Sequence, residues 1–582
     1  MTVTRGGEIM RLARTTAQLH PGQAGQRLRL RLQRLALNRR LPAASRWLLA
    51  GPDGAAGPGW PGDFTPLDAR PFDAETAGRT RAGELRLLGK TRVIAPPAAD
   101  GTARWAEADW AAADAPLLWR YHLYYWDWAW ALASELPAED ARTVFSAAWR
   151  SWHTAVGWGS GPAWYPYPAA LRAWSFCGLF AGLVRGSGIE GPYRGELAAL
   201  TGFLRRNLET DVGGNHLVKN LKALAGLAVF FGDDALLTRT LGRIGRELRV
   251  QVLPDGGHYE RAPAYHCQVL GDLIDLAGLL SAAGCPVPAE LDAAVTVMRN
   301  WLGAVLDPIG QVPLLNDGFP VDPAPLRPSP PPAGRLHLLP DTGLARVAVG
   351  GWHLLADVGL PCPAELPAHA HADTLGCVVH LDRQPLLVDT GTSGYAPGAA
   401  RDYERSTAAH NTLDVDGRDS TEVWGAFRAG RRARVRNVRA NADHGNGPAH
   451  GPVTVQAVHD GYRGLPGRPV HGRRWTVRAD ELRVDDTVTG GGRHRVTVRW
   501  HLAPGLRLRL ERGGAVVTGP AGEVAVAVTA NGEPALAALT GPVSAGFGRT
   551  VQAPVLACTV HRELPITIST RWRRVASRQE AL

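Results

Sequence analysis

The sequence contains little sulfur, since its 582 residues include six cysteines and three methionines. The cysteines are far apart, and none forms a CxxC pair or a short cluster with histidine. A zinc finger, a redox dithiol and a disulfide framework are therefore not expected. The cysteines are Cys177, Cys267, Cys285, Cys362, Cys377 and Cys558.

Long apolar runs are also absent. No stretch reaches the roughly 18 to 20 apolar residues that a membrane-spanning helix needs. The Arg-rich start of the chain contains neither the apolar h-region nor the small-residue cleavage site of a secretory signal. We therefore expect a soluble, cytoplasmic protein without a membrane span.

Acidic residues are outnumbered, with 54 Asp and Glu against 64 Lys and Arg, a net charge of +10 and a pI near 9.6. Such a balance favours a polyanionic partner, which is a nucleic acid, an anionic membrane surface or an acidic polysaccharide. A nucleic acid is not expected, because the chain has no recognised binding motif and no Lys-rich arm with interleaved aromatics. In the basic run 27–40, Arg27, Arg31 and Arg34 share a helical face beside leucines. This pattern favours a helix docked on the body of the protein over a membrane or nucleic-acid arm.

The first half of the chain is helical in its pattern. Apolar residues recur at spacings of three and four between Gly, Pro and Asp breakers, which predicts at least eight successive helices. Their short connections indicate antiparallel hairpins, arranged as a bundle, a solenoid or a closed toroid. The expected helices cover residues 117–136, 140–156, 168–184, 195–209, 215–231, 234–253, 265–284 and 290–306.

A proline-rich segment at 319–336 marks the expected domain boundary. Beyond it, short runs with period-two alternation and Gly-rich turns predict an antiparallel β-sandwich. We therefore expect an α+β protein with a helical domain at 1–325 and a β-sandwich domain at 335–582. The expected strands cover residues 344–350, 352–359, 375–382, 384–391, 433–440, 453–459, 474–490, 494–503 and 523–532.

Two segments of the helical half concentrate polar side chains that chemistry can use. In 213–220, Asn215 can cap a helix and place His216 in its first turn, although an ordinary cap and a half-buried histidine explain the pattern as well. In 255–266, a Gly-rich turn leads into a helix that Pro263 can start, with Tyr265 in its first turn. A tyrosine that only packs is the alternative there.

A third segment lies in the strand-rich half. His369 and His371 project to the same side of a strand-like backbone, Asp389 ends a neighbouring strand, and His410 follows. Two histidines and a carboxylate fit a zinc site with one open position. A metal-free network of hydrogen-bonded histidines is the alternative.

Eight motifs in this order resemble the heparinase II/III family of polysaccharide lyases, which includes oligoalginate lyases. The resemblance implies an incomplete (α/α) toroid followed by a multilayer antiparallel β-sandwich. The motifs are RYHLYYWDW, WYPYPAALRAW, NHLVKNLKAL, DGGHYERAPAYH, VPLLNDG, AHAHADTL, PLLVDTGTSGY and RSTAAHNTLDVDG.

The resemblance implies a carbon–oxygen lyase that cleaves a uronate-containing acidic polysaccharide or oligosaccharide by β-elimination and leaves an unsaturated uronate end. Asn215 would hydrogen-bond the uronate carboxylate, and His216 would act as base or help to neutralise charge. Tyr265 matches the family's catalytic tyrosine, and His369 matches a histidine that faces the substrate. The alternative is a weakly catalytic or non-catalytic glycan-binding component of exopolysaccharide biosynthesis.

The resemblance also implies a Zn²⁺ site made by His371, Asp389 and His410, in which the metal orders the active site. Glu260, Tyr395 and Tyr403 are the expected substrate-binding residues. Some relatives carry an acidic residue shortly after the Asn-His pair, where this sequence has Lys219. Members of the family are mostly exported, which conflicts with the cytoplasmic location expected from the missing signal. The sequence does not indicate an oligomeric state.

Overall fold

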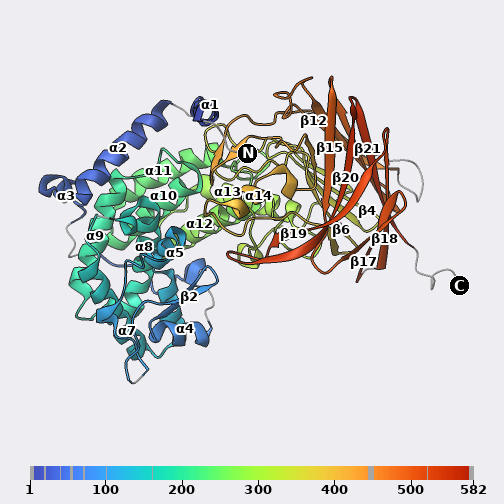
Figure 1. Cartoon of the computed structure of the whole chain (residues 1–582). Helices are drawn as coiled ribbons and strands as arrows, with labels where there is room; N and C mark the ends of the chain where they lie inside the picture. Colours follow the sequence, from blue (N-terminus) through green and yellow to red (C-terminus); the bar gives the residue numbers. More distant parts are fainter. Residues whose placement is uncertain are drawn as a thin grey trace. The chain divides into compact units, whose positions relative to one another are not determined.

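The computed structural model describes residues 5–18, 21–39, 41–52, 57–69, 73–99, 101–159, 161–442, 451–520 and 522–575, and Figure 1 traces the chain. Two compact units divide it. The helical unit consists of His20–Gln251 and Gln268–Thr296, and the sheet unit consists of Met1–Leu19, Val252–Cys267 and Val297–Leu582. These units differ from the expected domains at 1–325 and 335–582, because three segments of the first expected domain pack with the sheets.

The helical unit is built from successive helices and one two-stranded hairpin, β1–β2. Helices α12 and α13 each contribute residues to both units. The elements are α2 (Pro21–Asn38), α3 (Pro42–Leu48), α4 (Ala74–Arg81), β1 (Glu84–Leu87), β2 (Lys90–Val93), α5 (Leu117–Tyr125), α6 (Trp130–Glu135), α7 (Ala138–Ala155), α8 (Pro166–Leu179), α9 (Glu190–Arg206), α10 (Gly214–Phe231), α11 (Asp234–Gln251), α12 (Pro263–Ala282) and α13 (Ala289–Val305).

Helix α10 shows how the sequence sets these elements. It starts after Gly213 and stops at Gly232, and both glycines have left-handed φ angles, 71° and 67°, that other residues adopt at a cost. Most of its side chains are buried, as expected for a helix that is apolar nearly all round. The N-cap is Gly213, so Asn215 lies inside the first turn and is not the cap that the sequence suggested.

The helix expected over 117–136 is interrupted. Helix α5 ends at Tyr125, Trp126 has a left-handed φ of 60°, and α6 begins at Trp130. The Trp126 ring is fully buried and meets Phe176 edge-to-face, with the centroids 5.2 Å apart. We infer that burying this ring offsets the strain of the backbone, a tertiary effect that helical periodicity does not reveal.

Antiparallel strands make up most of the sheet unit, which also contains helices α1 (Arg5–Thr16) and α14 (Ala399–Glu404). A five-stranded sheet has the order β3-β4-β5-β6-β7, and a four-stranded sheet has the order β19-β20-β15-β8. An eight-stranded sheet has the order β11-β12-β13-β14-β21-β18-β17-β16, and β9 pairs with β10. The strands are β3 (Leu336–Leu339), β4 (Leu344–Val349), β5 (Trp352–Asp357), β6 (Cys377–Leu381), β7 (Gln384–Leu387), β8 (Leu413–Val415), β9 (Val423–Trp424), β10 (Arg428–Ala429), β11 (Val435–Ala442), β12 (Val453–His459), β13 (Val470–Val477), β14 (Glu481–Thr489), β15 (Arg493–His501), β16 (Arg507–Glu511), β17 (Gly514–Gly519), β18 (Gly522–Ala530), β19 (Ala535–Ser544), β20 (Thr550–Glu563) and β21 (Ile566–Arg574).

Alternating burial along these strands builds the core of the sheet unit. In β12 every second residue is buried, because successive side chains of a strand point to opposite faces of the sheet. The expected strand at 453–459 is confirmed residue for residue. Trp500 on β15 and Trp572 on β21 meet edge-to-face inside the core, with their centroids 5.9 Å apart. None of the helices within the described ranges is long and apolar enough to cross a lipid bilayer.

Candidate active site

Two of the expected catalytic residues, Asn215 and His216, lie in the first turn of α10 in the helical unit. Asn215 is buried, whereas the His216 side chain is about one-third exposed, at 36%. The His216 ring lies against Tyr167, with the centroids 4.3 Å apart, and its Nδ1 is 3.4 Å from Oε1 of Glu209. Asn220, one turn further along α10, donates to the other oxygen of Glu209 at 3.2 Å. Glu209, itself held by Asn220, therefore fixes the orientation of the His216 ring.

Lys219 departs from the acidic residue of some relatives, and the structure gives it a partner. Its Nζ lies 2.7 and 2.8 Å from the two carboxylate oxygens of Asp272 on α12. Lys222 also contacts Asp272, at 3.0 Å, and Asp275, at 2.7 Å. All four side chains are largely buried. Lys219 thus belongs to a charge network inside the helical unit.

The sheet unit contains the other expected catalytic residues, Tyr265 and His369. Tyr265 lies in the first turn of α12, and its ring stacks on the imidazole of His369 with the centroids 3.7 Å apart. The Tyr265 hydroxyl is 2.7 Å from the hydroxyl of Tyr395. Nε2 of His369 is 3.0 Å from Oε2 of Glu260, which is buried. These four side chains therefore form one cluster, and two of them, Glu260 and Tyr395, were expected only through the resemblance.

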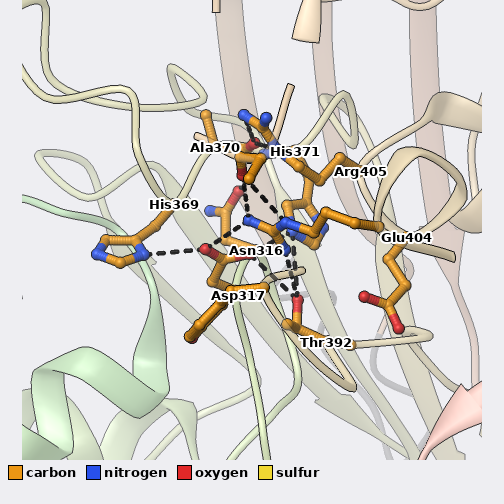
Figure 2. A network of polar contacts seen from close by, with 12 residues as sticks. Asn316, Asp317, His369, Ala370, His371, Thr392, Glu404 and Arg405 are labelled. Carbon is orange, nitrogen blue, oxygen red and sulfur yellow. Dashed lines mark hydrogen bonds and ion pairs between the residues drawn. The ribbon is translucent and has the colours of Figure 1, made fainter. Parts of the chain in front are cut away.

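A buried carboxylate, Asp317, bonds the ring nitrogen of His369 that Glu260 does not contact. One oxygen is 3.0 Å from Nδ1 of His369, and the other is 2.8 Å from Nε2 of His371. Figure 2 shows Asp317 at the centre of these contacts, with Thr392 beside it. The segment His369–His371 is a loop before β6 rather than a strand, so the two rings meet at one carboxylate without strand geometry.

Helix α14 supplies the counter-charge for Asp317. Both terminal nitrogens of Arg401 contact the carboxylate, at 2.5 and 2.9 Å, in the bidentate geometry that makes arginine pairs strong. Arg405, one turn later, donates to the carbonyl of Ala370, between the two histidines, at 2.9 and 3.1 Å. Both arginines also donate to carbonyls of residues 425–428 around the β9–β10 hairpin.

Burial and partners shift the charges of this cluster. Burial raises the pKa of Asp317, but Arg401 and the two histidines outweigh it and hold that pKa well below its usual range. Burial lowers the pKa of His369, yet the hydrogen bonds with Asp317 and Glu260 raise it to about 9. For His371, burial dominates and lowers the pKa to about 3. An ionised Asp317 only accepts hydrogen bonds, so Nε2 of His371 donates to it and Nδ1 of His371 carries the lone pair.

The expected zinc ligands lie close to one another, although the structure does not assemble them into a complete site. Nδ1 of His371 and Nε2 of His410 are buried without a hydrogen-bond partner among the residues that the structure describes, and the two rings are 5.2 Å apart. Asp389 instead contacts Nδ1 of His410, at 2.8 Å. No group of three His, Cys, Asp or Glu side chains in the described ranges converges closely enough to hold a metal. The two unpartnered nitrogens fit a metal, and Asp389 would have to turn toward it.

The structure places the two expected substrate-binding tyrosines differently. Tyr395 lies within the cluster, whereas the Tyr403 hydroxyl lies beside the backbone of Gly541 on β19. Sequence reasoning assigned no role to Asp317, Arg401 or Arg405. Asp317 lies in the VPLLNDG motif, and this membership was the one feature of the sequence that could have marked Asp317 as a site residue.

The fold, a helical part followed by antiparallel sheets, is shared with solved polysaccharide lyases. Residues 196–329 match the model described as "Heparinase II/III N-terminus", and residues 331–571 match "Heparinase II/III-like, C-terminal". The chain belongs to the heparinase II/III-like family of polysaccharide lyases. No curated protein matches the sequence.

Solved structures show the same fold. Heparinase III has a TM-score of 0.71 at 14% identity, covering 96% of this chain and 93% of its own. A mutant of the heparan sulfate lyase HepC from Pedobacter heparinus has a TM-score of 0.62 at 15% identity, covering 93% and 89%. The predicted fold class, a helical (α/α) part followed by an antiparallel β-sandwich, is thereby confirmed.

Proposed function

We propose that this chain cleaves a uronate-containing acidic polysaccharide by β-elimination. In this reaction a base removes the proton at C5 of the uronate, the C4–O4 bond breaks as the C4–C5 double bond forms, and an acid protonates O4. The observation that carries the proposal is the stack of Tyr265 on His369, with the Tyr265 hydroxyl 2.7 Å from that of Tyr395. A hydroxyl held between donors and acceptors can deliver or take a proton without moving far.

Tyr265 is the proposed general acid, and for one uronate epimer it is also the base. An ordinary Tyr pKa near 10 is too high for an efficient base at neutral pH. Tyr395, whose own pKa is raised by burial and by Asp317, keeps its proton and donates it toward Tyr265. A hydrogen bond to the deprotonated form of a group stabilises that form, so Tyr395 supports a transient Tyr265 oxyanion.

The developing negative charge on the uronate carboxylate needs stabilisation, because electrostatic effects of this kind usually contribute most to catalysis. We assign this to Asn215, whose amide can donate a hydrogen bond, and to His216, which acts as base or neutralises charge. His369, anchored by Asp317 and Glu260, contacts the substrate beside Tyr265. Tyr403 stays a secondary candidate for substrate binding.

A zinc ion bound by His371, His410 and Asp389 is part of the proposal. Its support is the pair of buried nitrogens, Nδ1 of His371 and Nε2 of His410, that have no hydrogen-bond partner within the described ranges. When bound, zinc would order the segment that carries His369 and would not need an open position for the substrate. His371 would bind the metal through Nδ1 while its Nε2 keeps the hydrogen bond to Asp317, an arrangement that is common for histidine ligands.

The test is to incubate the protein with heparan sulfate, chondroitin sulfate, alginate and bacterial exopolysaccharides and to follow the absorbance of the unsaturated uronate. Heparan sulfate comes first, because a lyase for it has the same fold. We expect absorbance to rise on at least one substrate and not with Tyr265→Phe. Failure on every uronate by a folded, zinc-loaded protein would contradict the proposal and favour the glycan-binding alternative.

A further inference from the structure

Helix α2 in the helical unit has two apolar faces instead of one. Leu30 and Leu37 are 3% and 1% exposed and pack against the unit. Leu28, Leu32 and Leu35 are 59%, 58% and 45% exposed. At 100° per residue these three side chains lie on the side of the helix opposite to Leu30 and Leu37. The leucines noted beside the arginines in the sequence are therefore not the ones that pack α2 against the helical unit.

Polar contacts fix which face of α2 is turned inward. Gln23 donates to the carbonyl of Asp211 at 3.0 Å, and Arg27 lies 3.6 Å from the carboxylate of Asp211. The guanidinium of Arg34 lies over the ring of Tyr165, 4.6 Å from its centroid. These contacts and the two buried leucines leave the stripe of Leu28, Leu32 and Leu35 on the solvent side.

Unpaired arginines flank this leucine stripe. Arg29, Arg31 and Arg39 are exposed, and within the described part of the chain none of them forms an ion pair with an acidic side chain. Residues 21–39 and 41–48 contain six arginines and no Asp or Glu. Helix α3 follows directly, with Trp47 56% exposed. The surface is thus both apolar and uniformly positive.

We propose that α2 docks on an anionic lipid bilayer and lies parallel to its surface. Its 18 residues give a helix about 27 Å long. An amphipathic helix of this kind buries its apolar side chains at the boundary of headgroups and acyl chains, and its arginines reach the headgroup phosphates. Both halves of the surface, the leucines and the unpaired arginines, then have partners.

Two other possible partners of this surface would match only the leucines or only the arginines. In a second copy of the chain, stripe against stripe, the flanking arginines of the two helices would come together without an acidic residue between them, and like charges repel. An acidic glycan would pair with the arginines but leave Leu28, Leu32 and Leu35 in water. Charge complementarity and apolar area together favour the lipid surface.

The test is flotation of the full-length protein with vesicles of phosphatidylcholine alone and with added phosphatidylglycerol. We expect binding to the anionic vesicles only, and release at high salt because screening weakens the contact of arginine with phosphate. The variants Leu28→Ser/Leu32→Ser/Leu35→Ser and Arg29→Gln/Arg31→Gln/Arg39→Gln should each bind at least about tenfold more weakly. The changed side chains are exposed, so thermal unfolding should stay as in the parent protein.

The matched control is Leu510→Ser/Leu539→Ser, which removes two exposed leucines from the sheet unit and should bind like the parent. Four results would overturn the proposal. The first is no binding to anionic vesicles, and the second is equal binding by the leucine variant. The third is a dimer in light scattering that the leucine variant loses, which assigns the stripe to a second copy. The fourth is binding to an immobilised acidic glycan that requires the leucines.

Discussion

Asp317 and His369 share a buried hydrogen bond of 3.0 Å, and the opposite oxygen of the same carboxylate bonds His371 at 2.8 Å. One side chain thus connects the histidine proposed to touch substrate with the histidine proposed to hold zinc. Arg401 balances its charge through two further contacts. The positions of both histidines depend on this carboxylate.

Asp317→Asn should therefore lower activity by about 10- to 100-fold, as loss of a carboxylate behind a functional histidine commonly does. It should also lower the free energy of unfolding by about 3–5 kcal/mol, because Arg401 would stay buried without its counter-charge. Activity and urea unfolding are the two measurements. Asp402→Asn is the control, because Asp402 is exposed on the same helix, α14, and should change neither. Full activity in Asp317→Asn would contradict the assigned role.

Removal of the Tyr265 hydroxyl should lower kcat by about 10²- to 10⁴-fold, the usual contribution of a positioned acid or base. Tyr265→Phe keeps the ring that stacks on His369, so the fold should be retained. Tyr395→Phe should have a smaller effect, because Tyr395 acts through the Tyr265 hydroxyl. The measurement is the initial rate of unsaturated uronate formation at saturating substrate.

Tyr193→Phe is the control for the tyrosine series. Its hydroxyl donates to the carbonyl of Phe176 at 2.9 Å inside the helical unit, so its loss should cost about 1 kcal/mol of stability and leave kcat unchanged. If Tyr265→Phe keeps the parent rate while remaining folded, the proposed acid is another group.

Metal content gives a readout that does not depend on activity. His371→Ala should lose zinc measured by elemental analysis, because one of the two unpartnered nitrogens disappears and a site with fewer protein ligands binds zinc more weakly. His353→Ala, a partly exposed histidine on β5, is the matched control and should keep the parent's zinc. Undiminished zinc in His371→Ala would rule out the ligand set.

The sheet unit should lose stability in acid through Asp486. Its carboxylate contacts Nε of Arg473 at 2.7 Å and Nε2 of His471 at 2.6 Å. Burial raises the pKa of Asp486, but Arg473 and His471 outweigh it and lower that pKa from 3.8 to about 2. A depressed folded pKa stabilises the fold above the unfolded pKa and loses that contribution as pH falls from about 4 to 2, about 2 kcal/mol in all.

Urea unfolding at pH 7 and pH 3 measures this effect. Asp486→Asn should be less stable at pH 7 by about 3–5 kcal/mol, because Arg473 loses its buried partner. It should also show a shallower fall in stability toward pH 3 than the parent protein. Equal slopes in the two proteins would show that Asp486 does not carry the acid sensitivity.

The local spacing of apolar residues predicted most of the helices and strands, because that spacing shows which side chains each element buries. The run from Asn215 to Phe231 is apolar between two glycines and forms α10, and alternation over 453–459 forms β12. The break at Trp126 was not predictable, because it depends on the pocket that Phe176 and other distant residues make for one ring. The His369–His371 loop was taken for a strand because alternation alone does not show pairing.

The sequence predicted the site residues that lie in recognisable motifs. It did not predict residues that reach the site only through the folding of distant segments. Residue pattern pointed to Tyr265 and His369, the resemblance added Tyr395 and Glu260, and the four side chains lie together. Arg401 is 84 residues from Asp317 in the chain, and no spacing rule links an arginine on a short helix to a carboxylate in a distant loop. Such pairs become visible only when the chain is folded.

The composition of the sheet unit has a practical consequence for fragments of this protein. The chain passes between the two units at residues 19/20, 251/252, 267/268 and 296/297. A fragment that begins at residue 335 would contain all strands from β3 to β21 but lack Glu260, Tyr265 and Asp317. Isolated, it would expose the surface that the 252–267 segment covers and leave His369 without its acidic partners. Truncation at the apparent helix-to-strand transition therefore yields an incomplete unit, and activity assays require the whole chain.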